Sequence, residues 1–246
     1  MIRDFVSIDL ETTGLLYKED GIIELAAIRF RDGKETDCFH TYINPGRDIP
    51  QRITELTGIT QEMIKDAPCF VDIWQELLNF IGDDVLMAHH ISFDYAFLKR
   101  AVVNYAPAGW AKGNGFEKKG IDTLKIARAF LSQLESRSLG FLCEHYQIPI
   151  LAHKAEEDAR ATAHLYFKMW EEFGNVTDTD ASMNKLFEPY TLIYKVKKES
   201  PITRAQKERL YRELEKHKIV PEYDVERLTK NEASRYLDRI LSEYGR

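Results

Sequence analysis

Two carboxylates lie on one face of the first strand-like stretch of the chain. Residues 5–14 read Phe-Val-Ser-Ile-Asp-Leu-Glu-Thr-Thr-Gly, in which apolar and small residues run into Asp9 and Glu11. On an extended strand, side chains two positions apart point to the same face. Because like charges repel, an apolar strand carries such a pair only if water solvates each carboxylate or a cation lies between them. The pair therefore predicts either a solvent-facing strand edge or a cation site.

The pattern that follows is typical of an α/β domain that opens with three antiparallel strands. Two stretches rich in β-formers, 22–30 and 36–43, flank the hairpin signal Asp32-Gly33. A short apolar run at 85–88 indicates a further buried strand. Apolar residues at helical spacing predict helices over 68–81, 93–105, 124–134, 139–146 and 155–173.

The last part of the chain differs from the rest in charge. Residues 195–246 contain 14 Lys and Arg against 10 Asp and Glu, whereas the whole chain has a net charge of −6. Two capping boxes, which start at Thr203 and Thr229, each open an amphipathic helix. Such a basic module can add affinity for phosphate groups, or its charges can simply solvate the helices. We expect a main domain over 1–174, a linker over 175–200 and a small helix-loop-helix module over 201–246.

Composition argues against several classes of protein. Cys38, Cys69 and Cys143 lack the spacing of a disulfide framework or a zinc site. No run approaches the ~18 apolar residues of a membrane span, and the first residues do not have the pattern of a signal sequence. We therefore expect a cytoplasmic globular protein.

Two further clusters of polar residues lie where predicted helices begin. At His89–Asp94 a buried strand ends, the chain turns, and Asp94 enters the first turn of a helix, where it either caps that helix or faces a shared centre. His153 lies five residues before Asp158. This spacing exceeds one helical turn, so His153 must lie outside the helix if both side chains face one centre. Near the first strand, Gly14 permits a tight turn in which a phosphate can be held.

Three motifs, taken in chain order, resemble those of the DEDDh family of 3′–5′ exonucleases. They are Asp9-x-Glu11-Thr12-Thr13-Gly14, His89-x-x-x-Phe93-Asp94 and His153-x-Ala155-x-x-Asp158. The likeness is greatest to the proofreading exonucleases of bacterial replicative DNA polymerases and spans residues 5–170. It implies a ribonuclease-H-like α/β fold, a mixed sheet with an antiparallel three-strand start flanked by helices. The predicted order of strands and helices agrees with this fold.

The resemblance also implies an activity and a site. Members of the family hydrolyse phosphodiester bonds at the 3′ end of DNA and release nucleoside 5′-monophosphates, with two divalent ions, Mg²⁺ or Mn²⁺. By similarity, Asp9 bridges both ions and Asp94 holds the second one. Glu11 and Asp158 complete the site of the ion on the nucleophile's side. His153 is the general base, a role that suits imidazole because its charge changes near neutral pH.

The same resemblance implies the substrate contacts. They are Thr12, Thr13, Gly14, Leu15, Leu56, His90 and Phe93. Leu15 and Leu56 occupy positions where related enzymes wedge apolar side chains against the terminal base; the alternative is that both are ordinary core leucines. His90 departs from the family pattern, which usually has Asn at this position to fix the turn or touch the substrate strand.

Other functions stay open at this point. The same chemistry on RNA would depend on 2′-hydroxyl contacts that the motifs do not reveal. An inactive nuclease fold that serves as a binding module belongs to another class, and the five intact metal and base residues argue against it. For the helical module we expect nucleic-acid binding, with docking onto a DNA polymerase or another replication or repair protein as the alternative.

Overall fold

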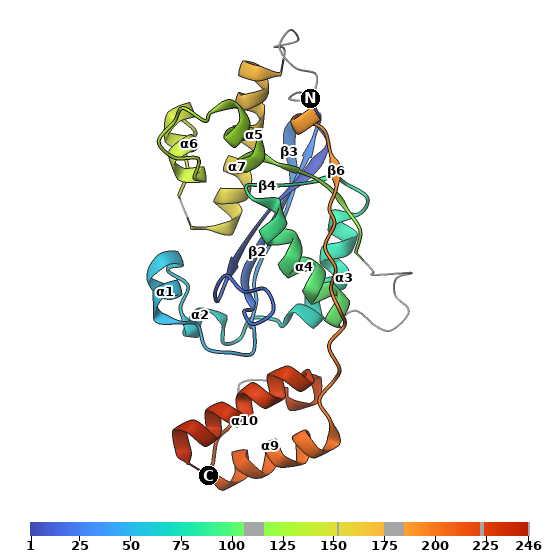
Figure 1. The fold of residues 1–246 in the computed structure, drawn as a ribbon, viewed down its shortest axis with the longest axis vertical. Coiled ribbons are helices and arrows are strands. Elements are labelled where there is room, and N and C mark those ends of the chain that lie inside the picture. Colours follow the sequence, from blue (N-terminus) through green and yellow to red (C-terminus); the bar gives the residue numbers. More distant parts are fainter. Residues whose placement is uncertain (106–115, 152, 175–184, 222–223, 246) are drawn as a thin grey trace. The chain divides into compact units, whose positions relative to one another are not determined.

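The computed structural model of the chain contains two compact units, Met1–Val196 and Lys197–Arg246. Figure 1 colours the larger unit from blue to orange, and the two helices of the smaller unit follow in deeper orange and red. None of the described helices is both long and apolar enough to cross a membrane. The structure describes residues 1–105, 116–151, 153–174, 185–221 and 224–245.

A six-stranded mixed sheet lies at the centre of the larger unit, with the strand order β3-β2-β1-β4-β5-β6. The first three strands are antiparallel neighbours, β4 and β5 run parallel to β1, and β6 is antiparallel to β5. Asp32 and Gly33 turn the β2–β3 hairpin with φ angles of 49° and 73°, as the sequence predicts. The strands are β1 (Phe5–Thr12), β2 (Ile22–Arg31), β3 (Lys34–Tyr42), β4 (Leu86–Ala88), β5 (Lys119–Asp122) and β6 (Tyr190–Thr191).

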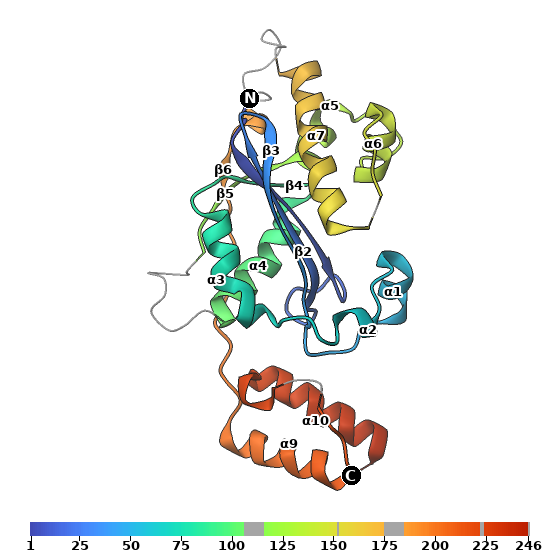
Figure 2. The ribbon, with the colours of Figure 1, turned by 180° about the vertical axis from the view of Figure 1, so that it is seen from behind.

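Helices cover both faces of this sheet, which Figures 1 and 2 show from opposite sides. One buried apolar cluster contains side chains of α5, α6 and α7, and another contains those of α3 and α4. This flanked, mixed sheet confirms the predicted α/β fold class. The helical elements of the unit are α1 (Gln51–Thr57), α2 (Gln61–Ile64), α3 (Phe70–Ile81), α4 (Ile91–Tyr105), α5 (Thr123–Phe130), α6 (Leu139–Tyr146), α7 (Ala155–Phe173) and the 3-10 turn η1 (Lys185–Phe187).

Helix α7 packs closely against the sheet because its inner face is made of small residues. Ala155, Ala159 and Ala163 recur every fourth residue and are fully buried. Ser7 Oγ of β1 donates a hydrogen bond to the Ala159 carbonyl at 2.7 Å. The residues at the start of α7 are therefore held next to β1 and β2.

The boundary between the units differs from the predicted one. Residues 175–184 of the expected linker lie outside the described part of the chain, but Tyr190–Thr191 pair with β5. Phe187 and Leu192 are buried, with exposures of 1% and 5%. Leu192 fits because Gly120 of β5 has no side chain; a Cβ there would lie 2.8 Å from Leu192 Cδ1. Residues 186–194 read Leu-Phe-Glu-Pro-Tyr-Thr-Leu-Ile-Tyr, and this apolar and aromatic stretch supplies the burial within the range expected to be a linker.

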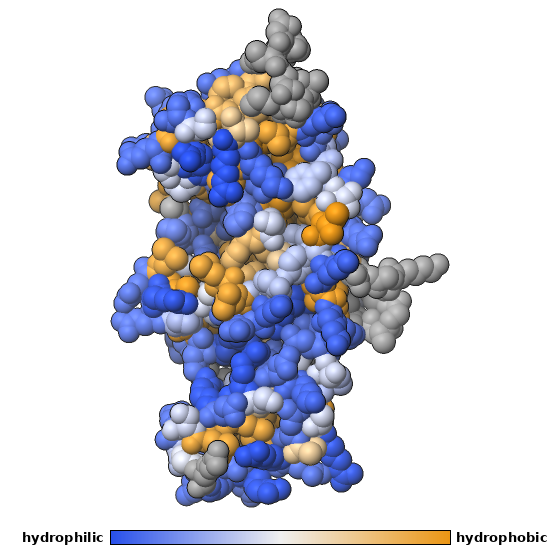
Figure 3. All heavy atoms as spheres, viewed as in Figure 1, coloured by the Kyte–Doolittle hydropathy of each residue, from blue (hydrophilic) through white to orange (hydrophobic). Residues whose placement is uncertain are grey.

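The smaller unit is a helix-loop-helix with its own apolar core. Its helices α9 (Arg204–Lys216) and α10 (Lys230–Tyr244) are separated by a loop that contains the turn η2 (Val225–Arg227). Both predicted capping boxes are present, with Thr203 and Thr229 accepting from backbone N–H groups of the first turns. Side chains of both helices form a separate buried cluster. Figure 3 shows hydrophilic residues over most of the visible face of each unit.

Candidate active site

Asp9 and Glu11 of β1 share one face of the sheet, as the strand pattern predicts. In the β1–β2 register, Asp9 lies opposite Ala26 and Glu11 lies opposite Glu24. Both β1 carboxylates are partly buried. A register shift follows between Glu11 and Thr12. Irregularities of this kind re-aim side chains, and they are common beside active sites.

The turn after β1 is closed by its own side chains. Thr12 Oγ1 donates to the Gly14 carbonyl at 2.6 Å, and Thr13 Oγ1 donates to Asp20 Oδ1 at 3.1 Å. Asp20 Oδ2 in turn accepts from the Leu16 N–H. Gly14 is required because a Cβ would lie 2.5 Å from this held carboxylate. The threonine hydroxyls therefore build the turn, and a substrate contact of Thr12, Thr13 or Gly14 stays a prediction.

Asp94 enters the site from the first turn of α4. Strand β4, which precedes α4, runs parallel to β1, so the carboxyl ends of the two strands lie at the same edge of the sheet. Asp94 is 3% exposed; burial raises its pKa, and the backbone N–H groups of its own residue and of Leu10 on β1 act in the opposite direction. It therefore reaches back to β1 and does more than cap its own helix.

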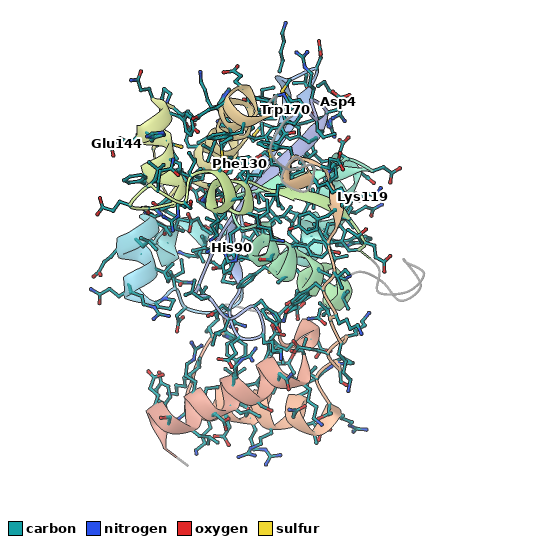
Figure 4. All side chains as sticks on the ribbon, turned by 45° about the horizontal axis from the view of Figure 1, so that its top comes forward. Asp4, His90, Lys119, Phe130, Glu144 and Trp170 are labelled. Carbon is teal, nitrogen blue, oxygen red and sulfur yellow. The ribbon has the colours of Figure 1, made fainter. Side chains whose placement is uncertain are left out.

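His90 forms the turn between β4 and α4, where Figure 4 labels it. Its φ of 83° lies in the left-handed region, which His, Asn and Asp adopt more readily than most residues with a side chain. Its N–H donates to Asp122 Oδ1 at 3.2 Å, and its ring stacks on Phe93 with the centroids 6.4 Å apart. The backbone requirement explains why His can stand where the family usually has Asn.

His153 and Asp158 meet at the start of α7. His153 precedes the helix with a φ of 65°, and its N–H donates to Asp158 Oδ2 at 3.2 Å. One possible ligand atom from each of Glu11, His153 and Asp158 lies within 4.8 Å of the other two. Asp9 and Asp94 stand outside this group of three but interact with it electrostatically. The structure thus brings the five predicted catalytic residues to one place.

Burial and mutual repulsion raise the pKa of the carboxylates in this cluster. Burial, followed by repulsion from Asp158 and Glu24, raises the pKa of Glu11 to about 7. Burial also raises the pKa of Asp158 to about 6. The pKa of Asp9 lies well above its usual range because the group is buried and is repelled by Asp94, Asp158 and Glu11. Burial likewise raises the pKa of Asp94.

The cluster fits a divalent cation. Its donors are mainly carboxylate oxygens, the hard ligands that Mg²⁺ and Mn²⁺ prefer. Asp158 Oδ1 is buried and has no hydrogen-bond partner in the described structure, which leaves a lone pair for a ligand. A positive charge next to Glu11 and Asp158 would also relieve the repulsion described above. These residues can therefore hold the metal that the family implies.

The predicted apolar contacts lie at the surface. Leu15 and Leu56 are 78% and 53% exposed, which rules out the alternative that they are core leucines. Phe93 is partly buried and packs on Phe97 with ring centroids 4.9 Å apart. Exposed leucine side chains suit contact with a base. That contact itself stays a prediction.

The sequence analysis assigned no role to two carboxylates that are buried in the structure. Glu24 is 1% exposed and faces Glu11 from β2. Asp122 is 2% exposed; it caps α5 by accepting from the Leu124 N–H and also holds the turn at His90. The available signal was an acidic residue next to apolar residues in a predicted strand, Glu24 within Ile22–Ile28 and Asp122 after Ile121, because an acid is rarely buried without a partner.

A ribonuclease-H-like sheet that carries four clustered carboxylates and a histidine defines the DEDDh class of exonucleases. Residues 6–166 match the RNase_T family, described as exonuclease, and the chain belongs to this family. It is 39% identical over 169 residues to the PolC-type DNA polymerase III of Bacillus subtilis (strain 168), and 36% identical over 184 residues to that of Thermotoga maritima. These matches cover 68% and 74% of this chain but 11% and 13% of those relatives.

Solved structures share the same fold. Exonuclease X, solved in complex with 5′ overhanging duplex DNA, superimposes with a TM-score of 0.55 at 25% identity, over 73% of this chain and 99% of that chain. Exonuclease I of E. coli, solved in complex with a dT13 oligonucleotide, superimposes with a TM-score of 0.60 at 18% identity, over 72% of this chain and 43% of that chain. The resemblance to the DEDDh exonucleases that the motifs indicate is thus confirmed.

Proposed function

We propose that this chain is a metal-dependent 3′–5′ exonuclease that releases nucleoside 5′-monophosphates from the 3′ end of DNA in proofreading or repair. The observation that carries the proposal is the convergence of Glu11, His153 and Asp158 within 4.8 Å, next to Asp9 and Asp94. Membership of an exonuclease family and similarity to polymerase III proteins support it. Because the chain matches a small part of those relatives, association with a polymerase is part of the proposal.

Each residue of the cluster has a role in this mechanism. Asp9, Glu11, Asp94 and Asp158 would hold two divalent ions, Mg²⁺ or Mn²⁺. When bound, such ions supply activation of the attacking water and stabilisation of the leaving 3′-oxygen. His153 is exposed, so its ring can take a proton from that water, while its backbone N–H stays bound to Asp158. Leu15 and Leu56 would pack against the terminal base.

We expect purified protein with Mg²⁺ or Mn²⁺ to shorten end-labelled single-stranded DNA from its 3′ end. Asp94→Asn, which keeps the shape of the side chain, is expected to lose this activity because the charge that faces the metal is gone. Parallel assays of duplex, mismatched duplex and RNA oligomers of the same sequence identify the preferred substrate. RNA trimmed faster than DNA would favour the exoribonuclease alternative, and DNA left uncut by both proteins would refute the proposal.

The smaller unit would add affinity for the nucleic-acid backbone. Arg209, Arg212 and Lys216 lie along one exposed side of α9 at a spacing of three and four residues. Lys216 lies 3.6 Å from a Glu213 carboxylate oxygen, whereas Arg209 and Arg212 make no ion pair with the described residues. Exposed guanidinium groups without a carboxylate partner suit phosphate oxygens.

Deletion of residues 197–246 is expected to weaken binding to single-stranded DNA and to flatten its salt dependence. The double variant Arg209→Gln/Arg212→Gln should lower the slope of log K against log salt by about 1 to 1.5, because each phosphate contact contributes ~0.7. Fluorescence anisotropy at several salt concentrations measures this slope. Arg204→Gln is the control, since Arg204 is paired with Glu208 at 2.7 Å. An unchanged slope in the double variant would favour a protein partner instead.

A further inference from the structure

Glu24 is a buried carboxylate directly behind the catalytic cluster. It lies on β2 with 1% exposure, opposite Glu11 in the β1–β2 register. Its Oε1 is 2.7 Å from His40 Nε2 on the neighbouring strand β3. Its Oε2 accepts a hydrogen bond from the Ala155 N–H, the first residue of α7, at 3.3 Å. Both oxygens of Glu24 are therefore engaged, each with a different element of the fold.

Helix α7 begins without a cap of its own. The residue at its N-cap position is Lys154, whose side chain makes no capping hydrogen bond. By contrast, the side chains of Asp122, Thr203 and Thr229 cap α5, α9 and α10. The first N–H groups of a helix have no partner within it, and a carboxylate near them is stabilised by the helix dipole. Glu24 supplies this partner from another strand.

The contact joins the two halves of the catalytic cluster. On one side, β1 carries Glu11, which pairs with the strand of Glu24. On the other side, the first turn of α7 carries Asp158, and His153 precedes it with a left-handed backbone. A residue with a side chain keeps such a backbone only where its surroundings enforce it. The hydrogen bond from Ala155 to Glu24 lies two residues beyond His153.

We propose that Glu24 is a positioning residue that caps α7 from β2 and thereby sets the distance between Glu11 and the His153–Asp158 pair. His40 holds the Glu24 carboxylate in the orientation that reaches Ala155. Because both oxygens of Glu24 are already engaged, the proposal assigns it no direct contact with metal or substrate. The kinetic part of this inference rests on the proposed function, whereas its structural part does not.

The test compares Glu24→Ala with Glu24→Gln, because only glutamine keeps an oxygen that can accept from Ala155. In Glu24→Ala we expect the amide proton of Ala155 to exchange ~10-fold faster in the metal-free protein, as for a lost helix cap. We also expect Mn²⁺ to bind more weakly by calorimetry, and kcat at saturating metal to fall ~10-fold or more with KM unchanged. Glu24→Gln should keep the slow exchange and stay within about threefold of wild-type kcat.

Tyr166→Phe is the matched control on the same helix. It removes the hydrogen bond from the Ile2 N–H to Tyr166 Oη, 2.9 Å long, which ties a later turn of α7 to the start of the chain. It should lower the melting temperature without changing Mn²⁺ affinity or the exchange of Ala155. Equal effects of Glu24→Ala and Glu24→Gln, or of Glu24→Ala and Tyr166→Phe, would overturn the proposal. Amide exchange and Mn²⁺ binding report on Glu24 even if the wild-type protein cuts no DNA. Failure of the positioning proposal can therefore be distinguished from failure of the proposed exonuclease function.

Discussion

Asp9→Asn is expected to lower the rate of hydrolysis by ~10³-fold or more while making the metal-free protein more stable. The rate is expected to fall because Asp9 is one of the four carboxylates that would hold the metal ions in the proposed mechanism. Stability rises because burial and the repulsion from Asp94, Asp158 and Glu11 no longer act on a charge at this position. Asparagine has nearly the same shape, so the packing of β1 is retained. A gain of ~1 kcal/mol would raise the melting temperature by about 2–4 °C in a unit of this size.

The measurement is thermal unfolding in EDTA near pH 8, together with the DNA trimming assay in Mn²⁺. Asp66→Asn serves as the control, because Asp66 is exposed and lies outside the cluster. It should leave both rate and melting temperature unchanged. An Asp9→Asn protein that is less stable in EDTA than the wild type would show that the carboxylates do not repel one another as their raised pKa values indicate.

The metal-free protein is expected to lose stability as the pH rises from about 4 to 7. The pKa of Glu11 is about 7 in the folded state against an ordinary 4.5, and that of Asp158 is about 6 against 3.8. At pH values between the unfolded-state and folded-state pKa of each group, the folded state binds more protons than the unfolded state. The free energy of unfolding therefore falls as the pH rises. The loss attributable to the two groups is ~2–3 kcal/mol, less than the sum of separate shifts because the groups interact.

Urea unfolding between pH 4.5 and 8, with EDTA and with Mn²⁺, measures this effect. Mn²⁺ at 100 times its dissociation constant should raise the free energy of unfolding by about 2.7 kcal/mol near neutral pH. The double variant Glu11→Gln/Asp158→Asn isolates the two groups from the other titrating residues, and its stability should depend less on pH than that of the wild type. If wild type and double variant gave parallel curves in EDTA, the pKa shifts of Glu11 and Asp158 would be disproved.

The regular elements and the site were predictable because their signals are local. An apolar run with two carboxylates on one face predicts strand β1. Two residues, Asp32 and Gly33, are enough to predict the hairpin turn. Four-residue sequence patterns likewise predict the helix caps at Thr203 and Thr229. The proposed metal and base residues were chosen from three ordered motifs, and the structure brings these residues together from β1, α4, α7 and the residues just before α7.

What the sequence did not reveal includes one contact between distant parts of the chain and two details of local geometry. Glu24 acquires its role only when Ala155, 131 residues later, begins a helix beside it. The hydrogen bonds by which the hydroxyls of Thr12 and Thr13 close the turn after β1 were not expected, and substrate contact of these residues stays a prediction. The left-handed backbone of His90 is equally invisible in the sequence, although it explains a departure from the family pattern. Residue type alone does not reveal which atoms these side chains contact or which φ angle the backbone adopts.

The strand formed by Tyr190–Thr191 decides where the nuclease unit can be cut. A fragment that stops at residue 174 lacks this strand and leaves β5 as an open edge, a template for pairing between molecules. It also lacks Phe187, whose buried ring would leave a void costing ~3–5 kcal/mol if the space stayed empty. Aggregation of such a fragment would result from the loss of this strand and of Phe187, and not from a property of the intact nuclease unit. Truncations intended to separate catalysis from the helical unit should therefore keep the chain through Val196.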